Sequence, residues 1–287
     1  MTSIVFGASG MVGSCIAARL AREGGTVVGV SRFARKSASI SWISADCTRL
    51  EPANLPQADV VYSAIHASIF VKAMAAVLRS RPARIVVISS TSVFSKVDSS
   101  NGAERAEIAE LIYAEREIIA CCATAGVEWT ILRPTLIYRE GRDKNITEIA
   151  KLIRRIGFMP LYGAASGLRQ PVHAEDLAIG AIAAAKSPNA ANMAYSTTGL
   201  ETITYREMAG RVFDGLARKR RLVPFPPVAW KAAFGLVKPI YPWVTPAMGE
   251  RMLKDLAFDS SAAVTDFGWK ARNFAPRFGS GSGEDTL

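Results

Sequence analysis

Three glycines near the start of the chain constrain its fold more than any other feature. Gly7, Gly10 and Gly13 fall in the run GASGMVG, which follows the apolar residues 3–6 and precedes a helical pattern over 11–22. A strand, a glycine turn and a helix in this order form the first unit of a Rossmann-type sheet. The glycines allow a tight turn, and the unpaired N–H groups at the helix start favour an anion. The spacing predicts a pyrophosphate-binding loop; a turn without a ligand is the alternative.

The residues after this loop alternate between strand-like and helix-like patterns. Strands are predicted at 26–30, 40–44, 59–64, 84–89 and 128–133, and helices at 68–79 and 103–124. Continuous apolar strands separated by helices are typical of a parallel sheet covered on both faces. Right-handed crossovers then give an α/β fold with a Rossmann-type doubly wound sheet.

The pattern loosens after about residue 138. Helices are predicted at 146–156 and 174–186, and residues 200–260 mix helices with Pro-rich turns. We therefore expect an NAD(P)-binding Rossmann domain over 1–140, a small mixed substrate-binding cap over 141–275 that is interleaved with the end of the sheet, and a flexible tail over 276–287.

The chain is strongly basic, with a formal net charge of +10. A solvated basic surface is one interpretation, and attraction of an anionic partner is the other. The densest basic run, 218–221, precedes a Pro-rich aromatic segment, so 218–244 is a candidate for peripheral contact with a membrane. Aromatic residues are not interleaved with the basic ones as base stacking requires, so no nucleic-acid partner is expected.

The sequence favours a cytoplasmic protein. No basic and apolar leader precedes the first strand, and no run of about 18 apolar residues occurs. No CxxC pair occurs among the four cysteines, which are Cys15, Cys47, Cys121 and Cys122. We expect them to be reduced, small core residues. The two histidines are well separated and no cysteine cluster accompanies them, so a metal site is not expected.

The end of the second strand indicates which dinucleotide the glycine loop would hold. An acidic residue at this position would bind the adenosine ribose hydroxyls of NAD. The chain has Ser31 and Arg32 instead, followed by Arg35 and Lys36. Arginine can grip a phosphate through two donors, so these cations favour the 2′-phosphate of NADP, with NAD as the alternative. Cations that are merely solvated on a loop are the plainer interpretation.

Further motifs follow in order along the chain. Asp46 comes after the third strand, SSTSVF of 89–94 after the fifth, LRPTLIY of 132–138 after the sixth, and RQPVHAED spans 169–176. With the glycine loop, these residues resemble the extended short-chain dehydrogenase/reductases, the NAD-dependent epimerase/dehydratase family that acts on nucleotide sugars. The resemblance runs from residue 3 to about 180, with a weaker similarity to about 270. It implies an NAD(P)-dependent epimerase, dehydratase or reductase acting on a nucleotide sugar.

The resemblance also implies roles for individual residues. The predicted cofactor contacts in the first three strand ends are Gly7, Ser9, Gly10, Met11, Val12, Gly13, Ser31, Arg32, Arg35, Asp46 and Cys47. The predicted cofactor contacts further along the chain are Ser63, Ala64, Ile65, Ser89, Glu117, Arg133, Pro134, Thr135 and Leu136. The predicted catalytic residues are Ser90, which would orient a substrate oxygen, and Tyr113. The predicted substrate contacts are Thr91, Asn145 and Arg169, of which the last two fall where the family often holds a diphosphate.

The catalytic pair departs from the family's pattern. The family has Tyr-x-x-x-Lys on the helix after the fifth strand, where the Tyr exchanges a proton while hydride moves to or from the nicotinamide. Here Tyr113 lies 23 residues beyond Ser90, but Glu117 stands in place of the Lys. A free tyrosine has a pKa of about 10 and is a poor base at neutral pH, and a carboxylate one helical turn away would repel the phenolate form. Arg116 would partly offset this effect, and Glu117 can still accept hydrogen bonds from ribose hydroxyls.

Three interpretations of the function therefore remain open. The first is an enzyme of the kind that the resemblance implies, whose usual Tyr/Lys chemistry is weakened or replaced. The second is a catalytically impaired dinucleotide-binding sensor or assembly protein of the same fold, because fold alone does not determine function. A reductase of a small carbonyl compound is a third reading, and it would have an apolar site. Members of the family often form homodimers.

Overall fold

The computed structural model describes residues 1–33, 35–49, 55–99, 101–226, 228, 230 and 246–279. Its contacts divide the chain into two units, each made of segments far apart in the sequence. Unit 1 comprises Met1–Thr135, Ala174–Thr198 and Phe258–Ala271, and unit 2 comprises Leu136–His173, Gly199–Ala257 and Arg272–Leu287. All predicted dinucleotide contacts except Leu136 lie in unit 1.

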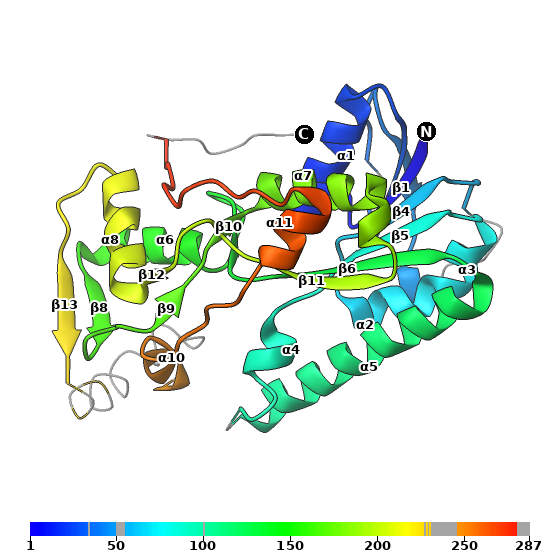
Figure 1. The fold of residues 1–287 in the computed structure, drawn as a ribbon. Helices are drawn as coiled ribbons and strands as arrows, with labels where there is room; N and C mark the ends of the chain where they lie inside the picture. The colour runs from blue at the N-terminus through cyan, green and yellow to red at the C-terminus, as the bar shows by residue number, and fades with distance from the viewer. Residues whose placement is uncertain are drawn as a thin grey trace. The chain divides into compact units, whose positions relative to one another are not determined.

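Unit 1 is built on a seven-stranded parallel sheet (Figure 1). Its strands are β1 (Thr2–Phe6), β2 (Thr26–Ser31), β3 (Ser41–Ser44), β4 (Val60–Ser63), β5 (Arg84–Ile88), β6 (Glu128–Pro134) and β11 (Met193–Thr197). Their spatial order is β11-β6-β5-β4-β1-β2-β3, and all neighbours are parallel. The chain therefore winds outward in both directions from β1, which makes the gap between β1 and β4 the switch point. This topology confirms the predicted doubly wound sheet.

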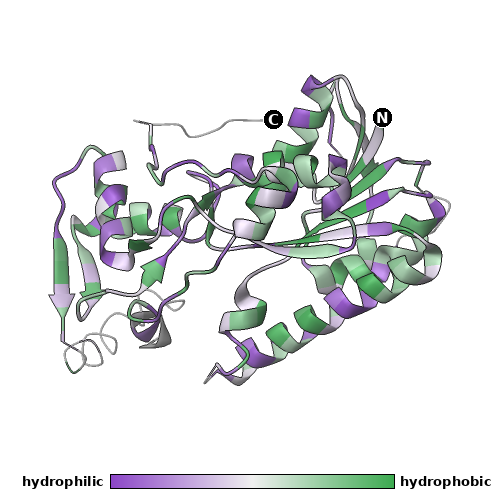
Figure 2. Cartoon of the chain, viewed as in Figure 1, coloured by the Kyte–Doolittle hydropathy of each residue, from purple (hydrophilic) through white to green (hydrophobic). Residues whose placement is uncertain are grey.

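Helices cover both faces of this sheet (Figure 1). One face carries α1 (Met11–Arg22), α7 (Ala174–Lys186) and α11 (Ser261–Phe267). The other face carries α2 (Ala67–Phe70), α3 (Met74–Arg79) and α5 (Gly102–Ala125), and the short α4 (Ser92–Ser95) packs on α5. Because both faces are covered, the central strands are mostly apolar, with exceptions such as the buried Arg84 of β5, and Figure 2 shows much of their length as hydrophobic. Among the described residues, unit 1 also contains 3₁₀ turns at Cys47–Arg49, Val71–Ala73 and Pro188–Ala190.

Three helices begin and end at the residues that the sequence predicts. The helix bounds predicted at 11–22, 146–156 and 174–186 are those of the structure. The single helix expected over 68–79 is wrong, because the chain there forms α2, a 3₁₀ turn and α3 in succession. The seventh strand, β11, was not expected; it pairs with β6 and extends the sheet with a segment from beyond α7.

Unit 2 is smaller, and its described residues form three two-stranded sheets and three helices. The strand pairs are β7 (Ile137–Tyr138) with β10 (Val172–His173), β8 (Met159–Tyr162) with β13 (Leu222–Phe225), and β9 (Leu168–Arg169) with β12 (Ile203–Thr204). The helices are α6 (Ile146–Ile156), α8 (Tyr205–Gly215) and α10 (Pro246–Arg251). Side chains of α6 and α8 share one apolar core, which includes Ile153, Phe213 and Phe274.

Two expectations fall largely outside the described residues. Of the predicted tail 276–287, residues 280–287 lie outside them. Of the candidate membrane-contact segment 218–244, residues 227, 229 and 231–244 also lie outside them. Within the part of the chain that is described, no helix has both the length and the apolar character needed to cross a bilayer.

Candidate dinucleotide site

The glycine loop joins β1 to α1 in a conformation that only glycine fits well. Gly7 has a φ of +72°, a value that L side chains rarely adopt. A Cβ on Gly7 would lie 2.7 Å from Ile65 Cγ2, and a Cβ on Gly13 would lie 2.1 Å from the Gly7 carbonyl oxygen. The backbone of α1 therefore packs directly against the loop, with no room for a side chain between them.

The start of α1 has the features of an anion site. Gly10 is the N-cap residue and has no side chain to accept hydrogen bonds from the first-turn N–H groups, and that turn, which begins with Met11 and Val12, contains no acidic residue. The Gly10 N–H itself donates to the Gly7 carbonyl over 2.8 Å and tightens the loop. Backbone N–H groups and the helix dipole are thus left to an anion. The cradle that a Cβ would fill fits the pyrophosphate of a dinucleotide.

Hydrogen bonds fasten the loop to the end of β2. The Gly7 N–H donates to the Val30 carbonyl over 3.1 Å, and the hydroxyl oxygens of Ser9 and Ser31 lie 3.1 Å apart. Ser31 is buried, whereas Arg32, the next residue, is exposed. The structure thus brings the predicted loop residues and the predicted β2 residues into one site.

The end of β3 places Asp46 at the same edge of the sheet. Its carboxylate accepts hydrogen bonds from the Thr48 N–H over 2.9 Å and from the Thr48 hydroxyl over 2.8 Å. The backbone bond from Thr48, supported by the charges of Arg49 and Arg32, lowers the pKa of Asp46. The next residue, Cys47, is buried, and burial raises the pKa of its thiol. Asp46 is therefore an ionised acceptor on the surface beside the loop.

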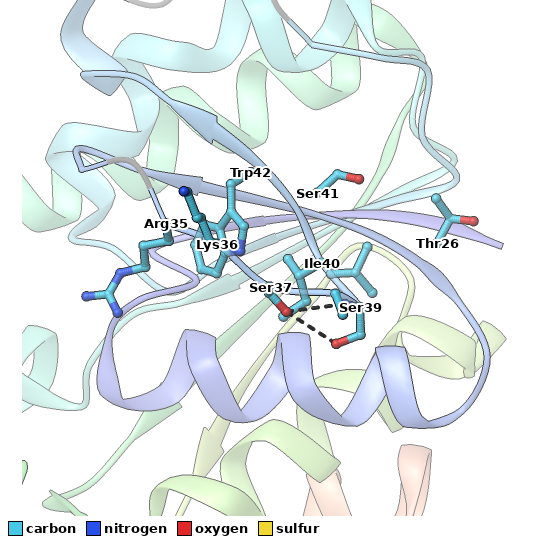
Figure 3. A pocket seen from close by; sticks show the side chains of 10 residues that line it. Thr26, Arg35, Lys36, Ser37, Ser39, Ile40, Ser41 and Trp42 are labelled. Atoms are coloured by element: carbon cyan, nitrogen blue, oxygen red, sulfur yellow. Dashed lines mark hydrogen bonds between the residues drawn. The ribbon is translucent and has the colours of Figure 1, made fainter. Parts of the chain in front are cut away.

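A basic pocket lies beside β2 and β3 (Figure 3). Its volume is about 480 Å³, and Arg35 and Lys36 contribute cations to its wall. Hydroxyls and an aromatic ring also line it, and the other lining residues are Thr26, Val27, Ser37, Ala38, Ser39, Ile40, Ser41 and Trp42. A Cβ on Gly29 would lie 2.9 Å from the Trp42 ring, so the missing side chain lets the ring lie against β2.

The end of β4 lies on the other side of the glycine loop. Ser63 is fully buried, and among the described residues its hydroxyl has no hydrogen-bond partner. Ala64 and Ile65 are partly exposed, and the Ile65 side chain is the atom group nearest to the missing Gly7 side chain. His66 is the N-cap residue that precedes α2, and its Nδ1 lies 2.8 Å from the Ser68 hydroxyl.

A buried ionic network joins the ends of β5 and β6 to α5. The Ser89 hydroxyl donates to Glu115, whose carboxylate also accepts from Arg133 Nε over 3.2 Å and from Arg133 Nη2 over 2.6 Å. The Arg133 guanidinium lies over the Phe94 ring, 5.0 Å from its centroid. Glu115 is not among the residues predicted from the sequence, although it continues the apolar helical repeat of Ile108, Leu111, Ile118 and Cys122.

The two residues after Ser89 form a tight turn into α4. The Ser90 hydroxyl donates to the Ser92 hydroxyl over 3.0 Å and accepts from the Ser92 N–H over 3.1 Å. The Thr91 hydroxyl is buried and donates to the Pro134 carbonyl over 3.1 Å. Ser90 is half-buried at this edge, whereas Thr91 is bound to the end of β6.

The predicted catalytic tyrosine lies on a different face of α5 from Glu115. Tyr113 is 63% exposed, and Glu115 is 4% exposed. Two residues along a helix correspond to a rotation of about 200°, so the two side chains point in nearly opposite directions. Leu111 occupies the buried face one turn before Glu115, and Glu117 is half-exposed. The face of α5 toward the sheet therefore presents Leu111 and Glu115, not a tyrosine and a lysine.

Thr135 is the last residue of the first segment of unit 1, and Leu136, Asn145 and Arg169 belong to unit 2. The Thr135 N–H donates to the Thr197 carbonyl of β11 over 3.3 Å, and the Leu136 carbonyl accepts from the Val172 N–H over 2.9 Å. Asn145 is an exposed residue of unit 2 that precedes α6, and its N–H donates to Asp143 over 2.8 Å.

Arg169 of unit 2 is buried, and its guanidinium already forms hydrogen bonds within the protein. Its guanidinium donates to the backbone carbonyls of Leu168, Lys254 and Arg251 over 2.7, 2.8 and 2.5 Å. It also lies 5.4 Å from the centroid of the Tyr205 ring. These contacts hold together three segments of unit 2.

Comparison with known proteins identifies relatives by sequence and by fold. A model of the NAD dependent epimerase/dehydratase family matches residues 3–196. A stretch of 107 residues is 31% identical to subunit 9 of the NADH dehydrogenase [ubiquinone] 1 alpha subcomplex, a mitochondrial protein of Dictyostelium discoideum. That match covers 37% of this chain and 28% of the relative, so the chain spans little more than a quarter of that protein's length.

Solved structures resemble the whole chain at low sequence identity. An epimerase from Methanothermobacter thermautotrophicus has a TM-score of 0.73 and 14% identity, over 94% of this chain and 87% of the other. The UDP-glucuronic acid 4-epimerase of Bacillus cereus, solved with UDP-glucuronic acid and NAD, has a TM-score of 0.71 and 16% identity, over 95% and 94% of the two chains. At these identities the likeness shows a shared fold.

Proposed function

Because this chain belongs to the NAD-dependent epimerase/dehydratase family, we propose that it binds NADP(H) and acts as an epimerase, dehydratase or reductase on a nucleotide sugar. The observation that carries this proposal is the cradle of Gly7, Gly10 and Gly13, which leaves backbone N–H groups to a pyrophosphate. Ser9 and Ser31 fasten this loop to β2, on whose side the adenosine half of a dinucleotide binds.

The preference for NADP rests on the residues after β2. No carboxylate follows this strand to accept the ribose hydroxyls, and the exposed Arg32 and Arg35 supply cations instead. Arg35 also lines the basic pocket of Figure 3, but that pocket includes Thr26 and Val27 at the start of β2, so the preference rests on Arg32 and Arg35 themselves and not on the pocket. A guanidinium binds a phosphate through two parallel hydrogen bonds, so the 2′-phosphate of NADP is the group that these residues suit.

The bound dinucleotide would supply the hydride acceptor or donor, and the protein would supply position and proton transfer. Ser90 is the proposed catalytic hydroxyl, because it is half-buried at the carboxyl edge of β5 and, among the described residues, its hydroxyl forms hydrogen bonds only with Ser92, two residues away. Tyr113 is the second proposed catalytic residue, although its exposed position on α5 gives it less support. Thr91, Asn145 and Arg169 are the proposed substrate contacts, and Arg169 is the least supported of them because its buried guanidinium already donates to three backbone carbonyls.

The buried face of α5 favours a second candidate, a protein that binds the dinucleotide without turning it over. Leu111 and Glu115 occupy that face, and neither is a proton donor held close to a lysine. The partial sequence match to a protein named as a subunit of an NADH dehydrogenase subcomplex is consistent with a role in assembly. Such a protein would keep the glycine cradle and lose only the chemistry.

Titration of the purified protein with NADPH and NADH, followed by nicotinamide fluorescence, tests both candidates at their common step. We expect NADPH to bind at micromolar concentration and NADH more weakly. If NADH binds more tightly, the preference for NADP is wrong. If neither binds, both candidates fail.

Incubation with UDP-sugars and the preferred dinucleotide then separates the two candidates. Formation of a new sugar, followed by chromatography, supports the enzyme, and the Ser90→Ala variant should lower its rate. Binding without product from any UDP-sugar tested supports the second candidate.

The cellular compartment, the oligomeric state and a membrane contact are also matters of proposal. All four cysteines are free, which suits a reducing compartment such as the cytoplasm. A homodimer and a membrane contact through residues 218–244 are further proposals that size determination and vesicle sedimentation would test.

A further inference from the structure

The order of the strands assigns the two halves of a bound dinucleotide to different parts of the sheet. The glycine loop follows β1, and β2 and β3 lie to one side of it, whereas β4, β5 and β6 lie to the other. The adenosine half lies on the β2 side in a sheet of this type. The nicotinamide half therefore extends over the ends of β4 and β5, where Ser89 and Ser90 follow the strand.

The ends of β5 and β6 are held by side chains as well as by the sheet. The Ser89 N–H continues the ladder by donating to the Leu132 carbonyl over 2.7 Å. Beyond that bond, Glu115 accepts from both the Ser89 hydroxyl and the Arg133 guanidinium, so one carboxylate joins three elements. The Glu115 side chain is 6% exposed and that of Arg133 is 19% exposed. Ion pairs that are shielded from water in this way are costly to break, because the remaining charge stays buried.

We propose that Glu115 is a positioning residue for the nicotinamide half of the dinucleotide: its carboxylate fixes Ser89 and Arg133, and through them the turn that carries Ser90. This inference rests on the proposed binding of a dinucleotide and concerns a residue that would not itself touch it. Glu115 lies on α5, which covers one face of the sheet, and the adenosine contacts follow β1, β2 and β3. Its effect should therefore be confined to one half of the ligand.

The exchange of one oxygen for nitrogen is enough to test this role. In the Glu115→Gln variant, one oxygen can still accept from Ser89 or Arg133, but the amide group places two donors where the structure requires an acceptor. The guanidinium then loses its paired contact, and the turn after β5 is no longer held in one conformation. The helix surface and the volume of the side chain are nearly unchanged.

The measurement compares the whole dinucleotide with its adenosine half. Affinities for NADPH and for adenosine 2′,5′-bisphosphate are measured for the wild-type protein and for Glu115→Gln, by nicotinamide fluorescence and by calorimetry. We expect the variant to bind NADPH about tenfold more weakly, the effect of one charge-assisted hydrogen bond, and to bind the adenosine fragment with unchanged affinity. The matched control is Glu110→Gln, an exposed position on the same helix, which should change neither affinity.

The possible outcomes distinguish this inference from its premise. Equal weakening of both ligands, or no weakening of NADPH, would overturn the positioning role and leave dinucleotide binding intact. A wild-type protein that binds neither ligand would instead overturn the proposed function. If Glu115→Gln does not fold, Glu115→Asp keeps the charge and shortens the side chain by one methylene, and the same selective loss is expected.

Discussion

Replacement of Gly13 by alanine should damage the dinucleotide site more than its small size suggests. The new Cβ would lie 2.1 Å from the Gly7 carbonyl oxygen and 2.6 Å from the Gly7 carbonyl carbon. Contacts between heavy atoms are favourable only at about 3.5 Å or more, so α1 and the loop must separate by more than about 1 Å. Both neighbours are backbone atoms, so rotation of a side chain cannot relieve the clash.

Two effects of different size follow from this displacement. The free energy of unfolding should fall by about 1–3 kcal/mol, the usual cost of an added methyl group in a packed interior. The first turn of α1 moves away from the pyrophosphate, and each lost hydrogen bond to a charged group costs about 1.5–3 kcal/mol of binding. We therefore expect the affinity for NADPH to fall at least tenfold, while most of the protein remains folded at room temperature.

Fluorescence titration with NADPH and thermal unfolding measure the two effects on the same samples. The matched control is Gly102→Ala at the start of α5, where the new Cβ would meet nothing closer than Arg105 Nη2 at 3.7 Å. This control should keep wild-type affinity and gain slightly in stability, because alanine favours the helix. A folded Gly13→Ala protein that binds NADPH as tightly as the wild type would refute the assignment of the cradle to the pyrophosphate.

Three further changes test other parts of the structure. Arg32→Ala with Arg35→Ala should weaken NADPH about tenfold or more and leave NADH unchanged, because only NADPH carries the 2′-phosphate; equal losses measured by titration would contradict the proposed selectivity. Tyr113→Phe should keep wild-type NADPH affinity because the ring is 63% exposed. Turnover assays then decide its role, because the variant loses rate only if the phenol takes part in the reaction. The Glu140→Gln variant should lose less stability than the wild type when the pH falls into the acid range. Burial alone would raise the pKa of Glu140, but hydrogen bonds from His173 and from the Arg277 N–H lower this pKa from its ordinary value. A carboxylate whose pKa is lower in the folded than in the unfolded protein stabilises the fold at pH values above its unfolded pKa, and this contribution is lost as the pH falls through its folded pKa. Equal acid sensitivity of the wild type and the variant in thermal unfolding would contradict this role of Glu140.

Glu115 illustrates what the sequence pattern contained but did not make evident. It falls in the repeat of buried positions on α5, yet the neighbouring Tyr113 attracts attention first because a Tyr-x-x-x-Lys pattern is expected there. Only the rotation of the helix against the sheet shows that the tyrosine points to solvent and the glutamate points inward. A short motif cannot specify this rotation, because it depends on the packing of the whole helix.

Arg169 makes the same point in unit 2. The sequence places it in a motif associated with a substrate diphosphate, but the structure surrounds its guanidinium with the carbonyls of Leu168, Arg251 and Lys254. Two of these partners lie more than 80 positions away in the sequence. No local pattern indicates such contacts, since they form only when distant segments pack together.

The sequence by itself determined the parallel sheet, the glycine cradle and the bounds of α1, α6 and α7. These features depend on apolar periodicity, on glycine's conformational freedom and on helix length, all of which are local properties. The tertiary structure alone decided that β11 joins the sheet, that α5 turns Glu115 toward Ser89 and Arg133, and that 174–198 and 258–271 belong with the first 135 residues. The physical reason is that burial, pairing of charges and strand neighbours depend on contacts between segments far apart in the chain, which no stretch of sequence specifies alone.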